Sequence, residues 1–428
     1  MHTASSTSAI LEGMLDIRFI RENAEQVQEA AQQKGYKDID IKRLIELDDN
    51  RRQLQQQVDE LRTKRNENAA KMKGGRPEQS LIDEGKQIKV ALAEREEYLA
   101  NAEKECHEIV RRVPNIIFDD VPLGGEDDSV EVKVWGEQKT GATDHLDFAT
   151  ARDWVDFERG AKVAGAKFYY LKGDLALLEN AITQFALDFV TKQGFTYLTV
   201  PHMVNSRTAE GSGFAPKGDA SSNEYFVEGE DLTLIGTAEA PLTGYHADEI
   251  LDEVQLPLLY VGYSPCYRKE AGTYGKHTRG LFRVHQFNKL EMYIFCLPEQ
   301  SRDMHEKILG IEEDIWQALN IPYHVINIAA GDLGAPAAKK YDIEYWSPVD
   351  QKYREITSCS NCTDYQARGL NIRVRRKDGD LQMVHTLNGT AVSLARSLVA
   401  IIENYQNEDG SLTIPKVLRP YMGSRERI

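Results

Sequence analysis

The feature that most constrains the fold of this chain is a pair of heptad repeats in its first third. Residues 44–72 and 81–113 each place a seam position every three or four residues, and most of these positions are apolar, as in a coiled coil. Gly74-Gly75-Arg76-Pro77 separates the two runs, and glycine and proline end helices. We therefore expect two helices of about 30 residues, each roughly 45 Å long, to fold back as an antiparallel coiled coil. Polar Arg65 and Asn68 fall on the first seam and should weaken packing near the tip.

The first of these helices is basic on a chain that is acidic overall. Residues 51–76 hold eight basic and three acidic side chains, a local charge of +5 where the whole chain carries −16. Solubility alone does not account for such asymmetry, and a basic stripe attracts polyanions such as nucleic acid. The alternative is a spacer or dimerisation hairpin whose charges are only solvated. The basic residues are Arg51, Arg52, Arg62, Lys64, Arg65, Lys71, Lys73 and Arg76.

Composition indicates a chain with a large core. Its 428 residues, 41% of them hydrophobic, leave room for two or three domains. The net charge of −16 argues against a general nucleic-acid coat, and DNA is not an expected partner. Five cysteines with irregular spacing indicate reduced thiols and a cytoplasmic protein. No apolar run approaches the roughly 20 residues of a membrane span. Residues 1–13 contain no Lys or Arg, so we expect a disordered extension there rather than a targeting segment.

The sequence after Pro114 predicts one α+β domain. An acidic linker over 124–128 is followed by helical and alternating segments without a regular βαβ order, which favours an antiparallel sheet. A helix is predicted to begin at Gly173 and to stop at Gly194, before a strand over 195–200. No Walker A or G-x-G-x-x-G stretch is present, so any ATP must be bound in another way. We expect an extension over 1–13, a helical arm over 14–118 and the α+β domain over 119–428.

Two neighbouring segments of this domain combine groups that bind phosphate, a base and an amine. The first is Tyr267-Arg268-Lys269-Glu270, and the second is a predicted strand over 282–295. Side chains alternate along a strand, so Phe287 and Glu291 share a face, roughly 13 Å apart. That span suits a nucleoside at one end and an amine at the other, with a phosphate held between them by Arg268. Taken alone, an Arg-x-Glu is more often an ordinary ion pair.

At these residues the chain resembles a known family. Arg268-Lys269-Glu270-Ala271-Gly272-Thr273-Tyr274-Gly275 resembles motif 2 of the class II aminoacyl-tRNA synthetases, in the form found in seryl enzymes. The helix and strand over 173–201 resemble motif 1, which implies a homodimer, and 385–396 resembles motif 3. The resemblance covers Met14 to Gly423 and implies a class II antiparallel sheet preceded by a coiled-coil arm. It implies a serine site made of Thr237, Ala238, Glu239, Arg268, Glu291, Asn388 and Thr390.

The resemblance also implies how ATP is held. Arg268 would bind the α-phosphate and the serine carboxylate, and Arg396 the γ-phosphate, so that both are catalytic. Glu355 and Ser358 offer oxygen ligands for Mg²⁺ bridging the phosphates. Adenine would stack on Phe287 and be recognised by Glu270 and the Val284 backbone. The complete ATP set is Arg268, Lys269, Glu270, Val284, Phe287, Glu355, Ile356, Thr357, Ser358 and Arg396.

The sequence departs from the family pattern in a few positions near motif 3. Ala391, Ser393 and Ala395 stand where many members carry glycine or another small residue, and Thr390 stands where many have serine. The C-x-x-C of Cys359 and Cys362 invites a zinc interpretation. A structural zinc site needs four ligands and no second pair is apparent, so none is expected, as the resemblance also implies.

The family implied is that of bacterial-type seryl-tRNA synthetases, which form seryl-adenylate from serine and ATP and transfer the seryl group to tRNA(Ser). The resemblance extends to tRNA(Sec) where one exists. The resemblance also implies that the basic arm binds tRNA by contacting the phosphate backbone of the RNA. The alternatives are a catalytically silent RNA-binding paralogue, a ligase that loads a carrier protein, and a synthetase for another amino acid. The first is disfavoured by the intact Arg268, Glu270, Glu355 and Arg396. The second is disfavoured by the basic arm, and the third by the arm together with Thr237-Ala238-Glu239.

Overall fold

The computed structural model of this chain describes residues 14–73, 78–214, 222–270 and 279–428. They divide into one unit up to Ile116 and a second from Ile117 to Ile428. The extension expected over 1–13 lies outside the described residues. None of the described helices combines the length and apolarity needed to cross a membrane. The helices of the first unit are α1 (Ile17–Glu22), α2 (Ala24–Gln33), α3 (Ile41–Lys71) and α4 (Gln79–Val110).

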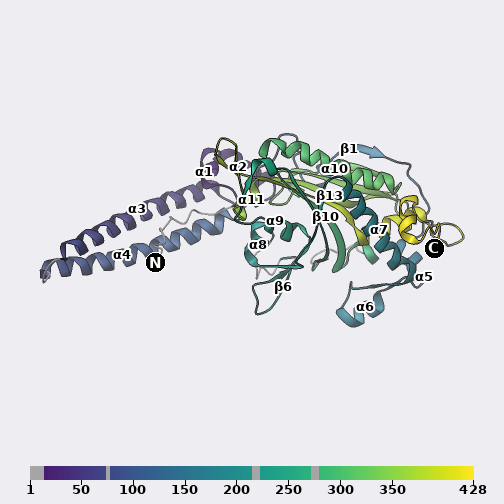
Figure 1. The fold of residues 1–428 in the computed structure, drawn as a ribbon, viewed down its shortest axis with the longest axis horizontal. Helices are drawn as coiled ribbons and strands as arrows, with labels where there is room; N and C mark the ends of the chain where they lie inside the picture. Colours follow the sequence, from purple (N-terminus) through teal and green to yellow (C-terminus); the bar gives the residue numbers. More distant parts are fainter. Residues whose placement is uncertain (1–13, 74–77, 215–221, 271–278) are drawn as a thin grey trace. The chain divides into compact units, whose positions relative to one another are not determined.

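The long helices α3 and α4 lie side by side and run antiparallel (Figure 1). Leu47 packs with Cys106 at one end of the pair, whereas Asn68 donates to the backbone carbonyl of Leu81 at the other end. This register is the one that a helical hairpin produces, and it confirms the seam predicted from the heptads. The apolar contacts between the two ends are made by Leu54, Val58, Leu92, Leu99 and Ala102.

One detail of the predicted seam was wrong. Asn68 is buried, and its Nδ2 donates to Glu84 Oε2 at 2.9 Å and to Leu81 O at 3.2 Å, so it joins the two helices instead of weakening them. Gly85 makes room for it, because a Cβ there would lie 3.1 Å from Asn68 Oδ1. Arg65 is exposed and leaves the seam, since a helix of 3.6 residues per turn drifts from a strict seven-residue repeat.

The second unit is built on an eight-stranded sheet with the order β1-β11-β12-β13-β16-β10-β9-β4. Neighbouring strands are antiparallel except β4 and β9, which are parallel. The fold class predicted from the sequence is thus confirmed. The strands are β1 (Val130–Trp135), β4 (Thr196–Thr199), β9 (Leu258–Tyr267), β10 (Gln286–Cys296), β11 (Tyr323–Asn327), β12 (Lys339–Ser347), β13 (Lys352–Thr363) and β16 (His385–Ser393).

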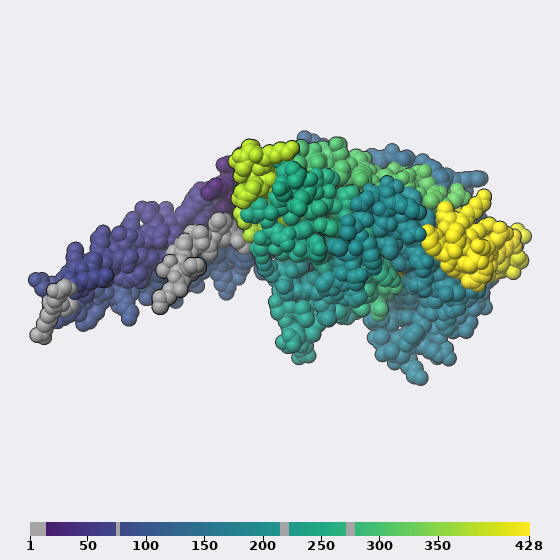
Figure 2. Space-filling view, in the orientation of Figure 1, coloured from purple at the N-terminus to yellow at the C-terminus, as the bar shows by residue number. Residues whose placement is uncertain are grey.

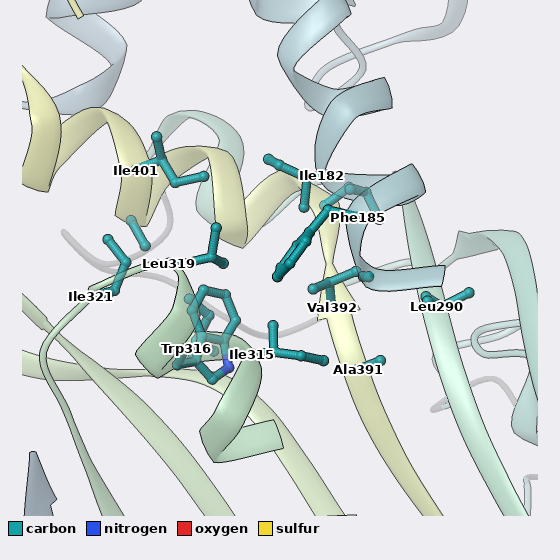
Figure 3. Close-up of a cluster of buried hydrophobic side chains, with 14 of the residues drawn as sticks. Ile182, Phe185, Leu290, Ile315, Trp316, Leu319, Ile321, Ala391, Val392 and Ile401 are labelled. Carbon is teal, nitrogen blue, oxygen red and sulfur yellow. The ribbon is translucent and has the colours of Figure 1, made fainter. Parts of the chain in front are cut away.

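Three helices cover one face of this sheet and form the main core with it. They are α7 (Gly173–Lys192), α10 (Ser301–Ala318) and α12 (Leu394–Tyr405). Figure 3 shows Ile182 and Phe185 of α7, Trp316 of α10 and Ile401 of α12 meeting Val392 of the sheet. This face therefore belongs to the core, and polar side chains with a function must lie on the other face.

Shorter elements pack around the sheet. They are α5 (His145–Ala151), α6 (Phe157–Ala164), α8 (Ser206–Gly211), α9 (Glu239–Gly244), α11 (Tyr365–Gly369), the two-stranded sheet β2 (Val155–Asp156) and β3 (Tyr170–Leu171), the sheet β5 (Met203–Val204), β7 (Thr233–Leu234) and β6 (Tyr225–Phe226), and the sheet β15 (Leu381–Met383), β14 (Arg373–Arg375) and β8 (Ile250–Asp252). A second apolar cluster joins α9 and α11 to Tyr293 and Phe295 of β10 on the face opposite the main core. These two helices thereby reach the polar face of the sheet.

The C-terminal segment, yellow in Figure 2, lies on the surface beside α7. Tyr421 donates to Asp188 of α7 at 2.7 Å, and Arg425 donates to Asp174 at 2.6 Å. Helix α7 begins at Gly173 as predicted, and β4 lies inside the predicted strand 195–200. The C-terminus therefore secures one side of α7.

The predicted strand 282–295 begins later than expected. Residues 280–282 form a 3-10 turn and β10 starts at Gln286, so Arg283 lies outside the strand. Phe287 and Glu291 do share a face of β10, because its pairing with β9 runs without a bulge. Lys289 lies on that face between them.

Candidate active site

A cavity lies where the ends of β9, β10, β13 and β16 meet α12. It encloses about 590 Å³ of empty space, including the part open to solvent. Its lining contains most of the residues that the sequence assigned to ATP, brought together from segments more than a hundred positions apart. They are Arg268, Glu270, Val284, Phe287, Glu355, Ile356, Thr357, Ser358 and Arg396, joined by Thr390 from the predicted serine set.

Two β-bulges decide which side chains reach the cavity. Glu355 and Ser358 are three positions apart and would face opposite sides of a regular strand. The register between β12 and β13 slips by one residue at Ile356, so both side chains line the cavity. An equivalent slip between β10 and β16 at Ala391 places Thr390 and Ser393 on the cavity side together.

Three members of the predicted ATP set place their side chains away from the cavity. Ile356 is buried in the main core, and the hydroxyl of Thr357 lies 3.4 Å from Nε1 of Trp316, on the side of α10. Both residues therefore present only backbone to the cavity. Lys269 is outside the lining, and its Nζ lies 5.2 Å from the ring centre of Phe226.

Two guanidinium groups share the cavity with one carboxylate. Arg268 Nε donates to Gly236 O at 3.2 Å, and its guanidinium carbon lies 5.3 Å from the centre of the Phe287 ring. Arg396 Nη1 is 2.9 Å from Glu355 Oε1 and donates to Glu355 O at 3.3 Å. Burial alone would raise the pKa of Glu355, but the positive charges of Arg396, Lys340 and Arg268 outweigh it and lower that pKa to about 2. Glu355 is therefore ionised, and both arginines lie within its field.

Glu270 has a partner that the sequence did not reveal. Its backbone is left-handed, with φ of +50°, and Arg283 Nη1 donates to its Oε2 at 3.0 Å. Arg283 also lines the cavity. Glu270 is thus held in place by an arginine at the edge of the cavity. The family resemblance also predicts that the loop Gly272 to Gly280, with Lys276, His277 and Arg279, touches the acceptor stem of tRNA. Most of this loop, including Lys276 and His277, lies outside the described residues. Its Arg279 is described and pairs with Asp147 at 2.6 Å.

The predicted serine residues lie beside this cavity, around the start of α9. Glu239 is its first residue, and its N–H donates to the Thr237 hydroxyl at 3.2 Å. Asn388 Nδ2 donates to Glu239 Oε1 at 2.9 Å. Burial, followed by the nearby charge of Glu291, raises the pKa of Glu239 to about 7. Ala238 is fully buried beneath it.

Lys289 is a site residue that the sequence reasoning missed. Its Nζ lies 2.5 Å from Glu291 Oε2, and both side chains are almost fully buried. The Thr390 hydroxyl also donates to Glu291 at 3.3 Å. Glu291 therefore already has a cation, whereas the sequence reasoning reserved it for a substrate amine. The signal was available, because period-two alternation places position 289 on the same face as 287 and 291.

The two cysteines of the C-x-x-C belong to different surroundings. Cys359 is part of the main core, whereas Cys362 accepts a contact from Asn388 Nδ2 at 3.7 Å. Within the described part of the chain, the group of side chains arranged to hold a metal ion is Asp144, His145 and Glu403, which includes neither cysteine.

The basic residues of α3 differ in how accessible they are. Arg51 is buried, and its Nε and Nη2 both donate to Asp48 Oδ1, at 3.1 and 2.9 Å, so it cannot reach a ligand. Arg52 also pairs with Asp48 at 2.9 Å, and Arg62 pairs with Glu96 at 2.8 Å. Arg76 lies outside the described residues. The exposed members are Lys64, Arg65, Lys71 and Lys73, together with Arg52, whose guanidinium is paired with Asp48.

Comparisons with known proteins agree with this fold. Residues 225–405 match the tRNA synthetase class II core domain (G, H, P, S and T), and residues 14–117 match the seryl-tRNA synthetase N-terminal domain. A serine–tRNA ligase of Dictyoglomus turgidum is 49% identical over 96% of this chain and 99% of its own length. The serine–tRNA ligase of Methanocella arvoryzae is 45% identical over 96% of this chain and its entire length.

Solved structures give the same result. The seryl-tRNA synthetase of Pyrococcus horikoshii complexed with ATP superposes with a TM-score of 0.88 at 43% identity, covering 97% of this chain and 99% of that one. The cytoplasmic serine–tRNA ligase of Naegleria fowleri in complex with AMP has a TM-score of 0.83 at 32% identity, covering 97% and 98%. An antiparallel sheet with this cavity defines a class II aminoacyl-tRNA synthetase core. The chain belongs, within that class, to the seryl-tRNA synthetase family.

Proposed function

We propose that this protein is a serine–tRNA ligase that activates L-serine with ATP and transfers it to tRNA(Ser). The observation that carries the proposal is a cavity lined by Arg268, Arg396 and the ionised Glu355, with the carboxyl groups of Glu239 and Glu291 beside it. Cations at one end suit a triphosphate, and carboxylates at the other suit an amino acid. The relatives named serine–tRNA ligase, similar over nearly their whole length, support the same conclusion.

In the first step an oxygen of the serine carboxylate attacks the α-phosphorus of ATP. The bond from that phosphorus to the oxygen bridging to the β-phosphate breaks, pyrophosphate leaves, and seryl-adenylate remains. No protein nucleophile is needed, so the chain contributes orientation and charge stabilisation. Arg268, which stands between the Phe287 ring and the amino-acid end, neutralises the α-phosphate and the carboxylate. Arg396, at the far side near Glu355, neutralises the γ-phosphate.

The residues present fit a divalent cation. The bulge at Ile356 turns the Glu355 carboxylate and the Ser358 hydroxyl to the same cavity, and the lowered pKa of Glu355 keeps it ionised. These are the hard oxygen donors that Mg²⁺ prefers. Glu355 and Ser358 would hold it, and when bound it supplies positive charge to the phosphates.

Serine is recognised by the polar groups at the start of α9 and on β10 and β16. Its ammonium group requires a carboxylate, and Glu239 and Glu291 provide two, with Lys289 balancing the second. Its hydroxyl is met by Asn388 and Thr390. Alanine lacks the hydroxyl and cannot make these hydrogen bonds, so it binds more weakly than serine.

In the second step the terminal ribose hydroxyl of tRNA attacks the seryl carbonyl carbon. AMP leaves, and the hydroxyl proton is released. The exposed Lys64, Arg65 and Lys71 of α3, with Lys73 just beyond its end, bind the phosphate backbone of the tRNA, because phosphate contacts read RNA shape and need accessible cations. A tRNA(Sec) of similar shape is charged in the same way where the cell contains one.

The active form is a homodimer. Helix α7 and β4 carry apolar side chains that remain exposed, with Leu177 at 51% and Tyr197 at 41%. Strand β4 is also at the edge of the large sheet, where a second copy can cover it. The protein works in the cytoplasm, where its five free thiols stay reduced.

Amino-acid-dependent exchange of pyrophosphate into ATP tests the proposal. Exchange is expected with serine and with none of the other amino acids. Exchange that depends on another amino acid would refute the substrate assignment. Absence of exchange with every amino acid would instead favour a catalytically silent RNA-binding paralogue.

A second experiment tests the division of labour between the units. Deleting residues 51–100 removes most of α3 and α4 and should abolish tRNA charging while leaving serine-dependent exchange nearly intact. Equal loss of both activities would contradict the role of the arm.

A further inference from the structure

A buried amide lies directly behind the carboxylate at the start of α9. Gln366, on α11, is 127 positions from Glu239 in the chain, and its Nε2 donates to Glu239 Oε1 at 2.7 Å. The side chain of Gln366 is fully buried. Neither its position in the sequence nor any motif marked it as part of the site.

Every hydrogen-bonding position of this amide is used. Nε2 also donates to the carbonyl of Ser212 at 3.0 Å, while Oε1 accepts the hydroxyls of Tyr293 and Thr386, each at 2.8 Å. Because a carboxylate and a carbonyl only accept and a hydroxyl can donate, the arrangement fixes which end of the amide is nitrogen. An amide held by four partners cannot rotate without breaking several hydrogen bonds at once.

The hydrogen bonds to the Glu239 carboxylate involve only one of its two oxygens. Gln366 and Asn388 both donate to Oε1, at 2.7 and 2.9 Å. Among the described residues these are the hydrogen bonds made to the carboxylate, so its Oε2 accepts none from them. The charged groups that act on Glu239 are Glu291, Lys289 and Arg268, and none of them donates a hydrogen bond to it.

We propose that Gln366 is a positioning residue for the amino-acid substrate: it fixes the Glu239 carboxylate through Oε1 so that Oε2 receives the polar groups of serine. The inference rests on the proposed function, because it takes serine as the ligand of Glu239. Tyr293, Thr386 and Ser212 serve as the rigid frame, and α11 thereby contributes to substrate selection without touching the substrate.

The test is steady-state pyrophosphate exchange by Gln366→Met in the full chain. Methionine has a similar length but no donor, so Glu239 loses one of the two groups that hold it. A hydrogen bond to a charged group corresponds to roughly a tenfold to hundredfold effect, and the KM for serine should rise by that factor. The KM for ATP should stay within about twofold of the wild-type value. An unchanged serine KM, or an equal rise in both KM values, would overturn the inference.

Gln317→Met is the matched control. Gln317 is half-buried on α10 and its Nε2 donates to the Tyr323 hydroxyl at 2.8 Å, so the substitution removes a similar contact away from the cavity. It should leave both KM values unchanged. A rise in the serine KM of this variant as large as that of Gln366→Met would show that any lost glutamine contact perturbs the site, and would also overturn the inference.

Gln366→Glu supplies a measurement that would not change if Gln366 had only a structural role. A carboxyl group at 366 can donate to Glu239 only while it keeps its proton, so the ratio of the serine KM of this variant to that of the wild type should be smaller at pH 6 than at pH 8. A ratio that does not change with pH would count against contact between the two groups. If Gln366→Met does not fold, Tyr293→Phe removes one donor to the amide and should raise the serine KM severalfold with the ATP KM unchanged. No change would refute the inference.

The outcomes separate this inference from the proposed function. If the wild-type protein shows no serine-dependent exchange, the proposed function fails. If the wild-type protein does exchange with serine and the Gln366 variants match it, only the role of Gln366 fails.

Discussion

Gly389 on β16 is a position in the sheet where the structure makes a clear steric prediction. A Cβ built there would lie 2.7 Å from Glu312 Oε1 and 3.0 Å from Cys359 Cβ, and it would overlap the Cγ2 methyl of Ile308. These atoms belong to α10 and β13, so no single flexible side chain can move aside. Gly389 also lies between Asn388 and Thr390, two of the proposed serine residues.

Gly389→Ala should therefore destabilise the protein and disturb serine binding. Overpacking a closed core costs typically about 1–3 kcal/mol, and contacts from two elements place this case near the upper end. One kcal/mol shifts a melting midpoint by about 2–4 °C in domains of roughly 150–250 residues, so a fall of several degrees is expected. The serine KM should rise more than the ATP KM, because the displaced strand carries Asn388 and Thr390.

Gly310→Ala is the control, because it is expected to raise the stability of the protein slightly instead of lowering it. Gly310 lies within α10 and a Cβ there meets nothing within 4 Å. Alanine is favoured over glycine inside a helix by roughly 0.5–1 kcal/mol, so this variant should be slightly more stable than the wild type. Differential scanning calorimetry and exchange kinetics on both variants provide the measurement. The reasoning is refuted if Gly389→Ala melts with the wild type or if Gly310→Ala is the more damaging of the two.

Three further predictions concern the charged groups. Burial raises the pKa of Glu239 to about 7, above its ordinary value, so the ionised form that binds serine is gained as the pH rises through 7. The serine KM measured by exchange should therefore be lower at pH 8 than at pH 6, and a KM that rises over this range would contradict this role. Arg396→Lys should raise the KM for ATP roughly tenfold to a hundredfold, since lysine cannot form the paired contacts of a guanidinium, and an unchanged ATP KM would exclude Arg396 from the phosphate site. On the arm, Lys64→Gln should remove one phosphate contact. The slope of the logarithm of the tRNA binding constant against the logarithm of the salt concentration should then fall in magnitude by about one, with no change in stability. Arg51→Met should instead lower the melting temperature of the arm, because fully buried Asp48 loses one of its cations, and the reverse pattern would invalidate the distinction between the two residues.

The parts of the fold that depend on local periodicity were predictable from the sequence. The seam of α3 and α4 follows from apolar spacing, and the start of α7 follows from Gly173 and the apolar face behind it. The residues of the nucleotide cavity were identified because their motifs are short and contiguous. Each such motif brings its own strand or helix terminus with it.

Other features of the site depend on segments that are remote in the chain. No local pattern shows that a strand slips by one residue at Ile356 or Ala391, because a bulge exists only relative to its partner strand. These slips decided that Ser358 points into the cavity and that Thr357 does not. The partner of Arg51 was also hidden, since a sequence count treats every cation on a helix as equally exposed.

The sequence by itself therefore determined the helical hairpin, the class of the sheet and the chemical groups available to the site. Only the tertiary structure decided which of those groups are paired, which are buried and which face a substrate. Lys289 neutralises Glu291, and Gln366 holds Glu239 across 127 positions of chain. The physical reason is that periodicity is a property of neighbouring residues, whereas hydrogen-bond partners and burial are set by strand register and packing between elements that meet only after folding.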